Sequence, residues 1–203
     1  MASAEDMTKR WNHKIHYHSV VLEAIPANAR SALDVGTGDG LLATDLRRVL
    51  DDVVAIDSDA AALARARSRD DRVRWIAGDV QEYRFARTFD VVASIATLHH
   101  LPDLACALRR FAELTAPGGV MVVVGLARSS GAADVAVDAA GVLAHRWLSS
   151  RRGYWEHSAP TVWPPPQTYA EVRECAMQVL PGVRWKRLAM FRYALVWHRP
   201  LDR

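Results

Sequence analysis

Residues 31–42, with the sequence SALDVGTGDGLL, restrict the possible folds of this chain more than any other segment. An apolar run at 32–35 leads into three alternating glycines, and an amphipathic helix is predicted at 41–50. Because the apolar residues continue up to the turn, we expect a strand buried on both faces, as in a parallel sheet. Glycine at Gly36 and Gly38 allows a sharp turn and the close approach of a ligand. The segment therefore predicts a nucleotide-binding site at the carboxyl edge of an α/β sheet.

The charges of the turn indicate which nucleotide binds. The dinucleotide fingerprint is G-x-G-x-x-G, with phosphates at a helix N-terminus. This chain has G-x-G-x-G instead, with Asp34 before the first glycine and Asp39 inside the turn. Two carboxylates repel a pyrophosphate but attract a cation. S-adenosylmethionine has no phosphate and carries a positive sulfonium and a positive amino group, so it fits this turn.

Further apolar runs alternate with helical patterns. The runs are at 53–57, 73–77, 89–95 and 120–124, and the helical patterns are at 59–69 and 103–115. This alternation predicts a parallel sheet with helices on both faces. Asp57 ends its run about 20 residues beyond the glycine turn, where an acid can accept hydrogen bonds from ribose hydroxyls. Alternatively, Asp57 caps the helix that begins near Asp59.

Five motifs lie in order between residues 31 and 126: LDVGTGDG, VVAIDSD, AGDVQEY, FDVVASIATLHHL and LTAPGGVMVVV. With them the chain resembles class I S-adenosylmethionine-dependent methyltransferases, of the small-molecule type related to ubiquinone and menaquinone biosynthesis. The resemblance implies a Rossmann-like, seven-stranded, mostly parallel sheet whose last strand is antiparallel. It also implies S-adenosylmethionine as methyl donor, with S-adenosylhomocysteine as product, lying across the carboxyl ends of the first four strands.

The resemblance also implies which residues hold the donor. They are Asp34, Gly36, Thr37 and Gly38 around the methionine portion, Asp57 and Ser58 at the ribose, Asp79 and Val80 at the adenine, and Ile95 and Ala96 below the sulfonium. Asp79 has a simpler alternative as a turn residue after Gly78. No metal ligands are expected.

The N-terminal residues 1–30 are rich in aromatic and imidazole side chains, with a short helix expected at 19–25. We expect this segment to fold over the donor as a lid, and Tyr17 to contact the donor, since aromatic faces attract cations. The alternative is a helix packed on the sheet edge.

A histidine is a natural proton acceptor near neutral pH. His99 and His100 follow the fourth strand, close to where the family places the methyl group, and only one of the two is expected to face the pocket. The alternative is a purely structural role for both in the loop leading to Pro102. His16, His18 and His157 are weaker candidates.

Residues 1–203 are interpreted as one domain: a lid at 1–30, a donor-binding core at 31–126, a substrate-facing part at 127–180 and a final strand pair at 181–203. The third part contains an amphipathic helical pattern at 131–148 and an aromatic, proline-containing loop at 149–167. Its aromatic residues either indicate a flat or apolar acceptor or only anchor the loop. Thr168 and Glu171 form a capping-box pattern that predicts a helix start.

The composition excludes other function classes. The net charge is only +3, from 26 basic and 23 acidic residues, and Asp70 and Asp71 interrupt the arginines at 65–74. We interpret those arginines as a solvated surface and expect no nucleic-acid or membrane partner. The N-terminus lacks the apolar core of a secretory signal. Cys106 and Cys175 are expected to be buried thiols of a reducing cytoplasm.

The sequence thus predicts a cytoplasmic enzyme, a monomer or homodimer, that methylates an oxygen, nitrogen or carbon of a small biosynthetic acceptor. A nicotinamide-dependent reductase is disfavoured, because Arg173 stands where a Tyr-x-x-x-Lys pair starting at Tyr169 needs lysine. Two alternatives stay open: a non-catalytic module that binds the donor, and a methyltransferase fold used for another reaction.

Overall fold

The computed structural model describes residues 15–131, 134, 164–189 and 191–201. A seven-stranded sheet has the order β3-β2-β1-β4-β5-β7-β6. Its strands are β1 (Ser31–Val35), β2 (Asp52–Asp57), β3 (Arg74–Ala77), β4 (Phe89–Ile95), β5 (Thr115–Leu126), β6 (Arg184–Leu188) and β7 (Arg192–His198). β1 to β5 pair in parallel, whereas β7 runs antiparallel to both of its neighbours. This confirms the Rossmann-like sheet with an antiparallel last strand.

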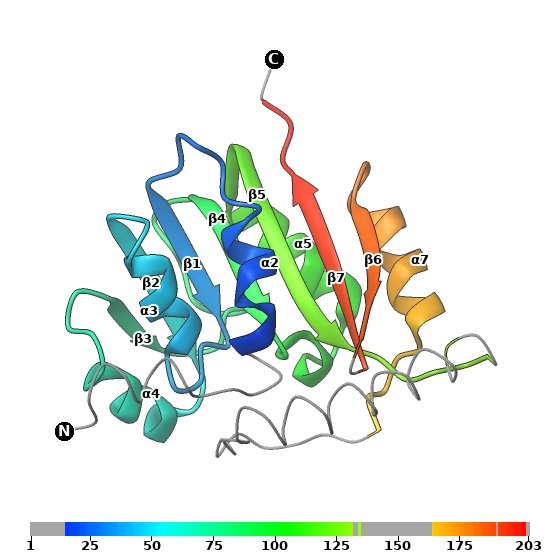
Figure 1. Ribbon diagram of the computed structural model, residues 1–203, viewed down its shortest axis with the longest axis horizontal. Coiled ribbons are helices and arrows are strands. Elements are labelled where there is room, and N and C mark those ends of the chain that lie inside the picture. The colour runs from blue at the N-terminus through cyan, green and yellow to red at the C-terminus, as the bar shows by residue number, and fades with distance from the viewer. Residues whose placement is uncertain (1–14, 132–133, 135–163, 190, 202–203) are drawn as a thin grey trace.

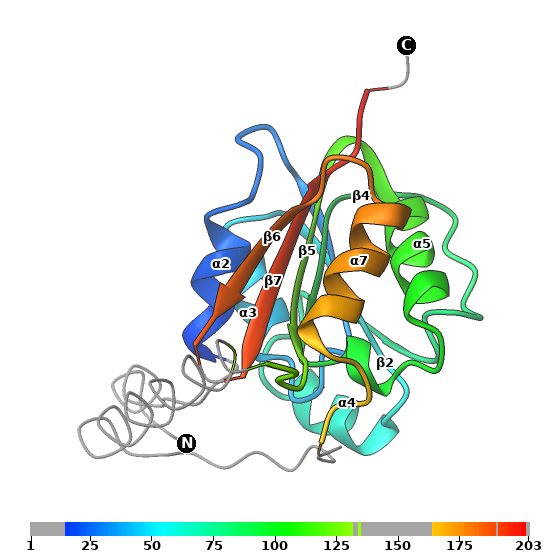
Figure 2. The same cartoon turned by 90° about the vertical axis from the view of Figure 1, so that its right-hand side faces the viewer.

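Helices cover both faces of this sheet. They are η1 (Ile15–Tyr17), α2 (His18–Leu22), α3 (Leu41–Arg47), α4 (Ala60–Arg67), η2 (Leu98–His100), α5 (Leu104–Leu114) and α7 (Tyr169–Val179). In Figure 1, α2 and α3 lie in front of the sheet and α5 and α7 behind it, and Figure 2 shows the same two layers from the side. The helices thus confirm the predicted three-layer α/β architecture.

The alternation of side chains along each strand builds two apolar cores. On β4, Val92 belongs to the core beneath α5 and α7, whereas Val91 and Ala93 belong to the core beneath α2 and α3. All three side chains are fully buried. A strand covered on both faces is mostly apolar in sequence. The two polar residues of β4 are hydrogen-bonded to β1: Ser94 donates to the Val35 carbonyl oxygen, and Asp90 accepts from Ser31.

Polar residues cap the N-termini of α4 and α7, close to where the sequence predicted that these helices begin. Asp59 caps α4 by accepting hydrogen bonds from the backbone N–H groups of Ala61 and Ala62. Thr168 and Glu171 form the predicted capping box at the start of α7. Asp59, and not Asp57, is therefore the cap of α4, which leaves the Asp57 carboxylate for another role.

Replacing Thr168 with alanine is expected to lower the free energy of unfolding by about 1 kcal/mol. The Thr168 hydroxyl accepts from the Glu171 N–H at 3.2 Å and donates to the Glu171 carboxylate at 2.9 Å. Urea unfolding followed by circular dichroism measures the change. Thr168→Ser keeps the hydroxyl and serves as the control, and equal losses in both variants would contradict the capping role.

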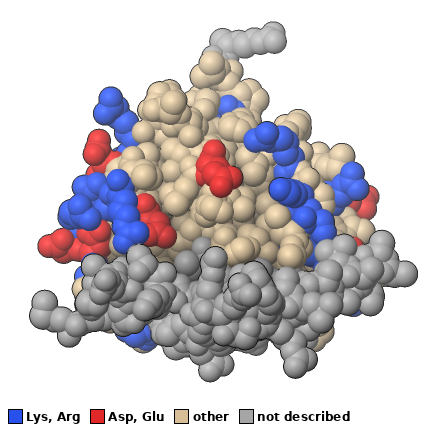
Figure 3. Space-filling view, in the orientation of Figure 1, with Lys and Arg blue, Asp and Glu red and all other residues tan. Residues whose placement is uncertain are grey.

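The charged surface on the β3 side of the sheet consists of paired groups. Arg72 contacts Asp70 at 2.8 Å, and Arg87 contacts Asp52. Figure 3 shows acidic and basic side chains next to one another on this left flank. At the opposite edge of the sheet, Arg184 and Lys186 of β6 are exposed. Among the arginines at 65–74, Arg65 and Arg72 form ion pairs, with Asp39 and Asp70.

Other expectations are corrected or lie outside the described residues. Cys106 is exposed and Cys175 only partly buried, so the expectation of two buried thiols is wrong. Cys106 lies on the solvent side of α5, whose buried side begins at Ala107. Residues 1–14, 132–133 and 135–163, with His157, lie outside the described part, so the lid and the acceptor-facing segment stay predictions. Among the described helices, none has the length and apolar content to cross a bilayer.

Candidate functional site

A cavity of about 380 Å³ opens at the carboxyl ends of β1, β2, β3 and β4. This volume lies within the range of small-molecule sites. Ten of the eleven residues expected to bind the donor line it: Asp34, Gly36, Thr37, Gly38, Asp57, Ser58, Asp79, Val80, Ile95 and Ala96. The exception is Tyr17. The fold therefore brings residues from four separate motifs to one site.

The glycine turn is fixed by its packing against the end of β4. Gly36 has φ of +69°, and a Cβ atom there would overlap the Thr97 side chain. Gly38 has φ of +54°, but a Cβ atom there would meet no other heavy atom within 4 Å. Gly36 is thus required by packing and backbone conformation together, whereas Gly38 leaves open space along the cavity.

The Asp57 carboxylate joins the end of β2 to the glycine turn. One oxygen accepts a hydrogen bond from the Gly38 N–H at 2.7 Å, and the other accepts from the Asp59 N–H at 2.9 Å. Each carboxylate oxygen can accept more than one hydrogen bond. Asp57 therefore orients the turn and keeps acceptor capacity for a ligand hydroxyl.

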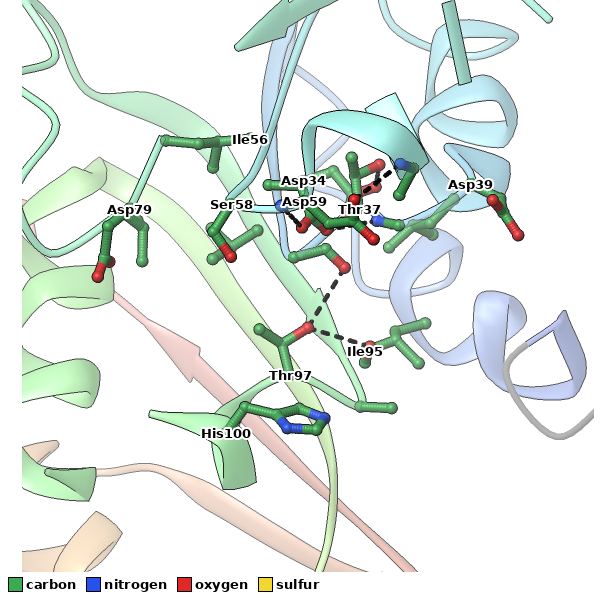
Figure 4. A pocket seen from close by; sticks show the side chains of 18 of the residues that line it. Asp34, Thr37, Asp39, Ile56, Ser58, Asp59, Asp79, Ile95, Thr97 and His100 are labelled. Atoms are coloured by element: carbon green, nitrogen blue, oxygen red, sulfur yellow. Dashed lines mark hydrogen bonds between the residues drawn. The ribbon is translucent and has the colours of Figure 1, made fainter. Parts of the chain in front are cut away.

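Asp34 is a buried carboxyl at the base of the turn, only 1% exposed. Its Oδ2 accepts a hydrogen bond from the Thr37 hydroxyl at 2.6 Å, as drawn in Figure 4. Burial raises the pKa of Asp34 to about 6, although the Thr37 bond and the nearby His18 act to lower it. Proximity to Asp57 raises it further. Asp34 thus titrates close to neutral pH inside the cavity.

Donor affinity is expected to rise as the pH increases through about 6, because a cationic ligand favours ionised Asp34 and releases its proton. The free energy of unfolding depends on pH in the opposite direction, because the contribution of Asp34 to it falls as the pH rises. The folded state holds this proton above the ordinary pKa of 3.8, so the group's contribution to the free energy of unfolding falls between 3.8 and about 6. Calorimetric titration of S-adenosylhomocysteine at pH values below and above about 6 measures the change in affinity. Asp34→Asn should flatten the profile, and an unchanged slope in that variant would contradict the assignment.

Asp39 does not contribute the free negative charge that its place in the turn suggested. Its Oδ1 accepts a hydrogen bond from Arg65 Nε of α4 at 2.9 Å. Both residues line the cavity. The argument that two turn carboxylates attract a cation therefore needs correction: Arg65 compensates Asp39, and further acidic lining comes from Asp57 and Asp79.

The end of β4 carries a strained connection to η2. Ala96 has φ of +58°, a left-handed conformation that is unfavourable for a residue with a Cβ atom. The next residue, Thr97, donates from its hydroxyl to the carbonyl oxygens of Gly36 and Ile95, at 3.3 and 3.4 Å. Figure 4 shows Thr97 between the glycine turn and His100. The left-handed turn thus directs Thr97 toward the cavity wall.

The two adjacent histidines of η2 have different surroundings. His100 lines the cavity, whereas His99 is 8% exposed and does not line it. The two rings lie 4.1 Å apart between centroids. This agrees with the expectation that one of the pair faces the pocket, and it selects His100.

Tyr17 lies away from the cavity, and His18 lines it instead. Tyr17 is 5% exposed, and its hydroxyl donates to the Ala189 carbonyl oxygen at 2.6 Å. This bond ties η1 to the connection between β6 and β7. Sequence reasoning counted His18 only as a weak candidate base and missed Thr97 and Arg65 as lining residues. No local signal marks Thr97 or Arg65, because their partners are distant in sequence.

The cavity fits the predicted donor in charge and shape. Carboxylates at the ends of β2 and β3, Asp57 and Asp79, face the same space as Gly38, whose lack of a side chain leaves room for a ligand. Apolar lining comes from Val80, Ile95 and other residues. Acceptors for hydroxyl, amino and sulfonium groups thus surround an apolar slot, as an adenosine with a cationic tail requires.

Comparisons with known proteins agree with this site. A protein-family model described as "Methyltransferase domain" matches residues 33–123 of this chain. An uncharacterized methyltransferase of Mycobacterium tuberculosis is 38% identical over 201 residues, covering 96% of this chain and 100% of that protein. A ubiquinone biosynthesis O-methyltransferase of Azorhizobium caulinodans is 32% identical over 64% of this chain and 53% of its own length. The chain thus spans about half of that second relative.

A solved structure shows the same fold. The N-methyltransferase NodS from Bradyrhizobium japonicum, in complex with S-adenosylhomocysteine, superposes with a TM-score of 0.61 at 17% identity. The match covers 92% of this chain and 87% of that one. With a relative that matches along its whole length, the family is shown: the chain belongs to the class I methyltransferases, which take their methyl group from S-adenosylmethionine.

Proposed function

We propose that this methyltransferase acts on a small-molecule acceptor bound at the η2 end of the cavity. One observation supports the proposal most: ten of the eleven residues expected to hold the donor line the same cavity as His100. S-adenosylmethionine supplies a methyl group that its sulfonium already activates. The protein therefore has to align the two partners, exclude water and, for some acceptors, remove a proton.

We assign the lining residues to parts of the donor. Asp57 and Ser58 hold the ribose, Asp79 and the Val80 N–H hold the adenine, Gly36, Thr37, Gly38 and Asp34 surround the amino-acid end, and Ile95 and Ala96 lie below the sulfonium. The sequence order of these residues supports the assignment. They lie at or just after the carboxyl ends of β1, β2, β3 and β4, which form one half of the sheet in the order β3-β2-β1-β4.

We assign the proton-accepting role to His100. It lines the cavity three residues after Thr97, and its backbone N–H donates to the Thr97 carbonyl oxygen at 2.8 Å. A general base must reach the acceptor proton, and position in the cavity is the first requirement. His99 fails this requirement because it does not line the cavity.

For the acceptor atom, the relative named a ubiquinone biosynthesis O-methyltransferase favours oxygen. An ionisable hydroxyl or acid would lose its proton to His100 before or during methyl transfer. Nitrogen and carbon acceptors are outcomes of the experiment below.

The proposal is tested by incubating the protein with methyl-tritiated S-adenosylmethionine and whole bacterial extract, and then separating small molecules from macromolecules. A labelled small molecule is expected, and alkaline lability of the label identifies methyl esters. Label found only in macromolecules would overturn the small-molecule acceptor. Calorimetric binding of S-adenosylhomocysteine without any labelled product would favour the non-catalytic module. Consumption of a compound without label transfer would favour another reaction on this fold.

His100→Gln is expected to lower turnover by about 10²–10⁴-fold, the contribution of a general base. Affinity for S-adenosylhomocysteine should change little, since the ring is assigned to the acceptor. Turnover with the identified acceptor and calorimetry measure the two effects separately. His99→Gln is the matched control, and an equal loss in both variants would contradict the assignment to His100.

A further inference from the structure

We propose that His18 binds the carboxylate of the donor's amino-acid end and thereby makes the cavity specific for ligands that carry this group. The inference rests on the proposed donor placement and extends it to the N-terminal helix α2. His18 is the first residue of α2, is 5% exposed and lines the cavity. A polar side chain buried at a cavity wall requires a partner, which makes its bonding informative.

Asp45 of α3 holds the His18 ring. The ring nitrogen Nδ1 lies 2.6 Å from Asp45 Oδ2, and the other carboxylate oxygen accepts from Arg48 Nη1 at 2.7 Å. A carboxylate bound to one ring nitrogen fixes the orientation of an imidazole. A ligand carboxylate at the other nitrogen would need that nitrogen to carry a proton as well, so that both nitrogens donate. Nδ1 is therefore occupied, and Nε2 is the ring nitrogen that a ligand in the cavity can reach.

The packing of α2 makes this arrangement rigid. Val21 of α2 is fully buried in the same apolar core as Leu42, Ala43 and Leu46 of α3. Tyr17, directly before His18, is anchored through its hydroxyl to Ala189. The packing of α2 and the hydrogen bond of the preceding residue thus fix the position of His18.

The charges of the cavity wall indicate what His18 binds. Five lining residues are acidic: Asp34, Asp39, Asp57, Asp59 and Asp79. Among the lining residues that the structure describes, only three side chains can carry a positive charge: His18, Arg65 and His100. The donor's carboxylate is repelled by the acidic wall, so it needs one of these three.

Position selects His18 among the three. Arg65 is paired with Asp39 and its side chain is 46% exposed. His100 lies at the end of β4, at the proposed acceptor side. His18 lies close enough to Asp34 to stabilise its ionised form. Asp34 thus offers acceptor oxygens for the ammonium of an amino acid, and His18 beside it offers the ring nitrogen for the carboxylate.

Three ligands separate the contacts of the amino-acid end when titrated calorimetrically into the full-length protein. S-adenosylhomocysteine carries both charged groups, its decarboxylated analogue S-adenosyl-3-thiopropylamine carries only the ammonium, and 5′-methylthioadenosine carries neither. In the unchanged protein we expect S-adenosylhomocysteine to bind at least about 10-fold more tightly than the decarboxylated analogue.

His18→Gln should lower the affinity for S-adenosylhomocysteine by about 10- to 100-fold and the affinity for each of the other two ligands by less than about twofold. Asp45→Asn, which disturbs the ring without removing it, should give a smaller loss with the same selectivity. His198→Gln, at an exposed histidine of β7, should change none of the three affinities.

Two results would overturn the inference: equal loss of all three ligands in His18→Gln, which indicates a structural role, or an unchanged preference for the carboxylated ligand. If the unchanged protein binds none of the three, the donor placement itself fails, and that outcome is distinct from both.

Discussion

Gly36→Ala is expected to destabilise the protein by about 3 kcal/mol, from left-handed backbone strain together with overpacking. The added methyl group would overlap the Thr97 side chain, which closes the end of β4 against the turn. Either Thr97 moves away, which disrupts η2 and His100, or the turn moves and its contact with Asp57 is lost. Donor binding should therefore fall below detection in the same variant. Thermal unfolding and calorimetric titration of S-adenosylhomocysteine measure the two effects.

Gly38→Ala is the matched control for stability. Gly38 also has positive φ, but a Cβ atom there meets no heavy atom within 4 Å. The substitution Gly38→Ala should therefore lower the free energy of unfolding only by the strain of the left-handed backbone, about 1–2 kcal/mol. A double variant, Gly36→Ala with Thr97→Gly, removes the overlapping atoms and should recover part of the stability. Equal losses in the two single variants would show that contact with Thr97 is unimportant.

Asp57→Ala is expected to lower the affinity for S-adenosylhomocysteine by about 10- to 100-fold, the range for loss of hydrogen bonds to a charged group. The substitution removes the proposed acceptor for the ribose hydroxyls. It also leaves the N–H groups of Gly38 and Asp59 without the carboxylate that orients them. Both losses act on the donor, and calorimetric titration measures their sum.

The contribution of the ribose hydroxyls is isolated with a ligand that lacks both of them and therefore cannot donate hydrogen bonds to Asp57. A 2′,3′-dideoxy analogue of the ligand should lose affinity in the unchanged protein and little more in Asp57→Ala. Asp51→Ala, at an exposed carboxylate before β2, should leave both affinities within about twofold. Unchanged affinity in Asp57→Ala would show that the ribose assignment is wrong.

The sheet and ten of the residues that line the cavity could be predicted because their signals are local. β4 was predicted with the bounds that it has, since a strand covered on both faces is mostly apolar in sequence. The same holds for Thr168 and Glu171, whose capping box lies within four residues. Gly36 and Asp57 belong to motifs at strand ends, and parallel strands bring such ends to one edge.

The remaining features depend on contacts between distant residues. Asp39 is compensated by Arg65, 26 residues away in sequence, and nothing near Asp39 indicates this. Tyr17 and His18 are neighbours, and only the packing of α2 against α3 decides which of them lines the cavity. His99 and His100 raise the same problem, because the rotation of a single 3₁₀ turn selects the inward residue.

The charged edge strand β6 has a consequence for self-association. Its unpaired side carries the hydrogen-bonding groups that could recruit a second copy of the sheet. Antiparallel pairing of two β6 strands would place the cations Arg184 and Lys186 of one copy near those of the other. Like charges across such a ladder repel one another. A continuous fourteen-stranded sheet is therefore disfavoured at this edge, and so is the open-ended stacking that leads to fibres.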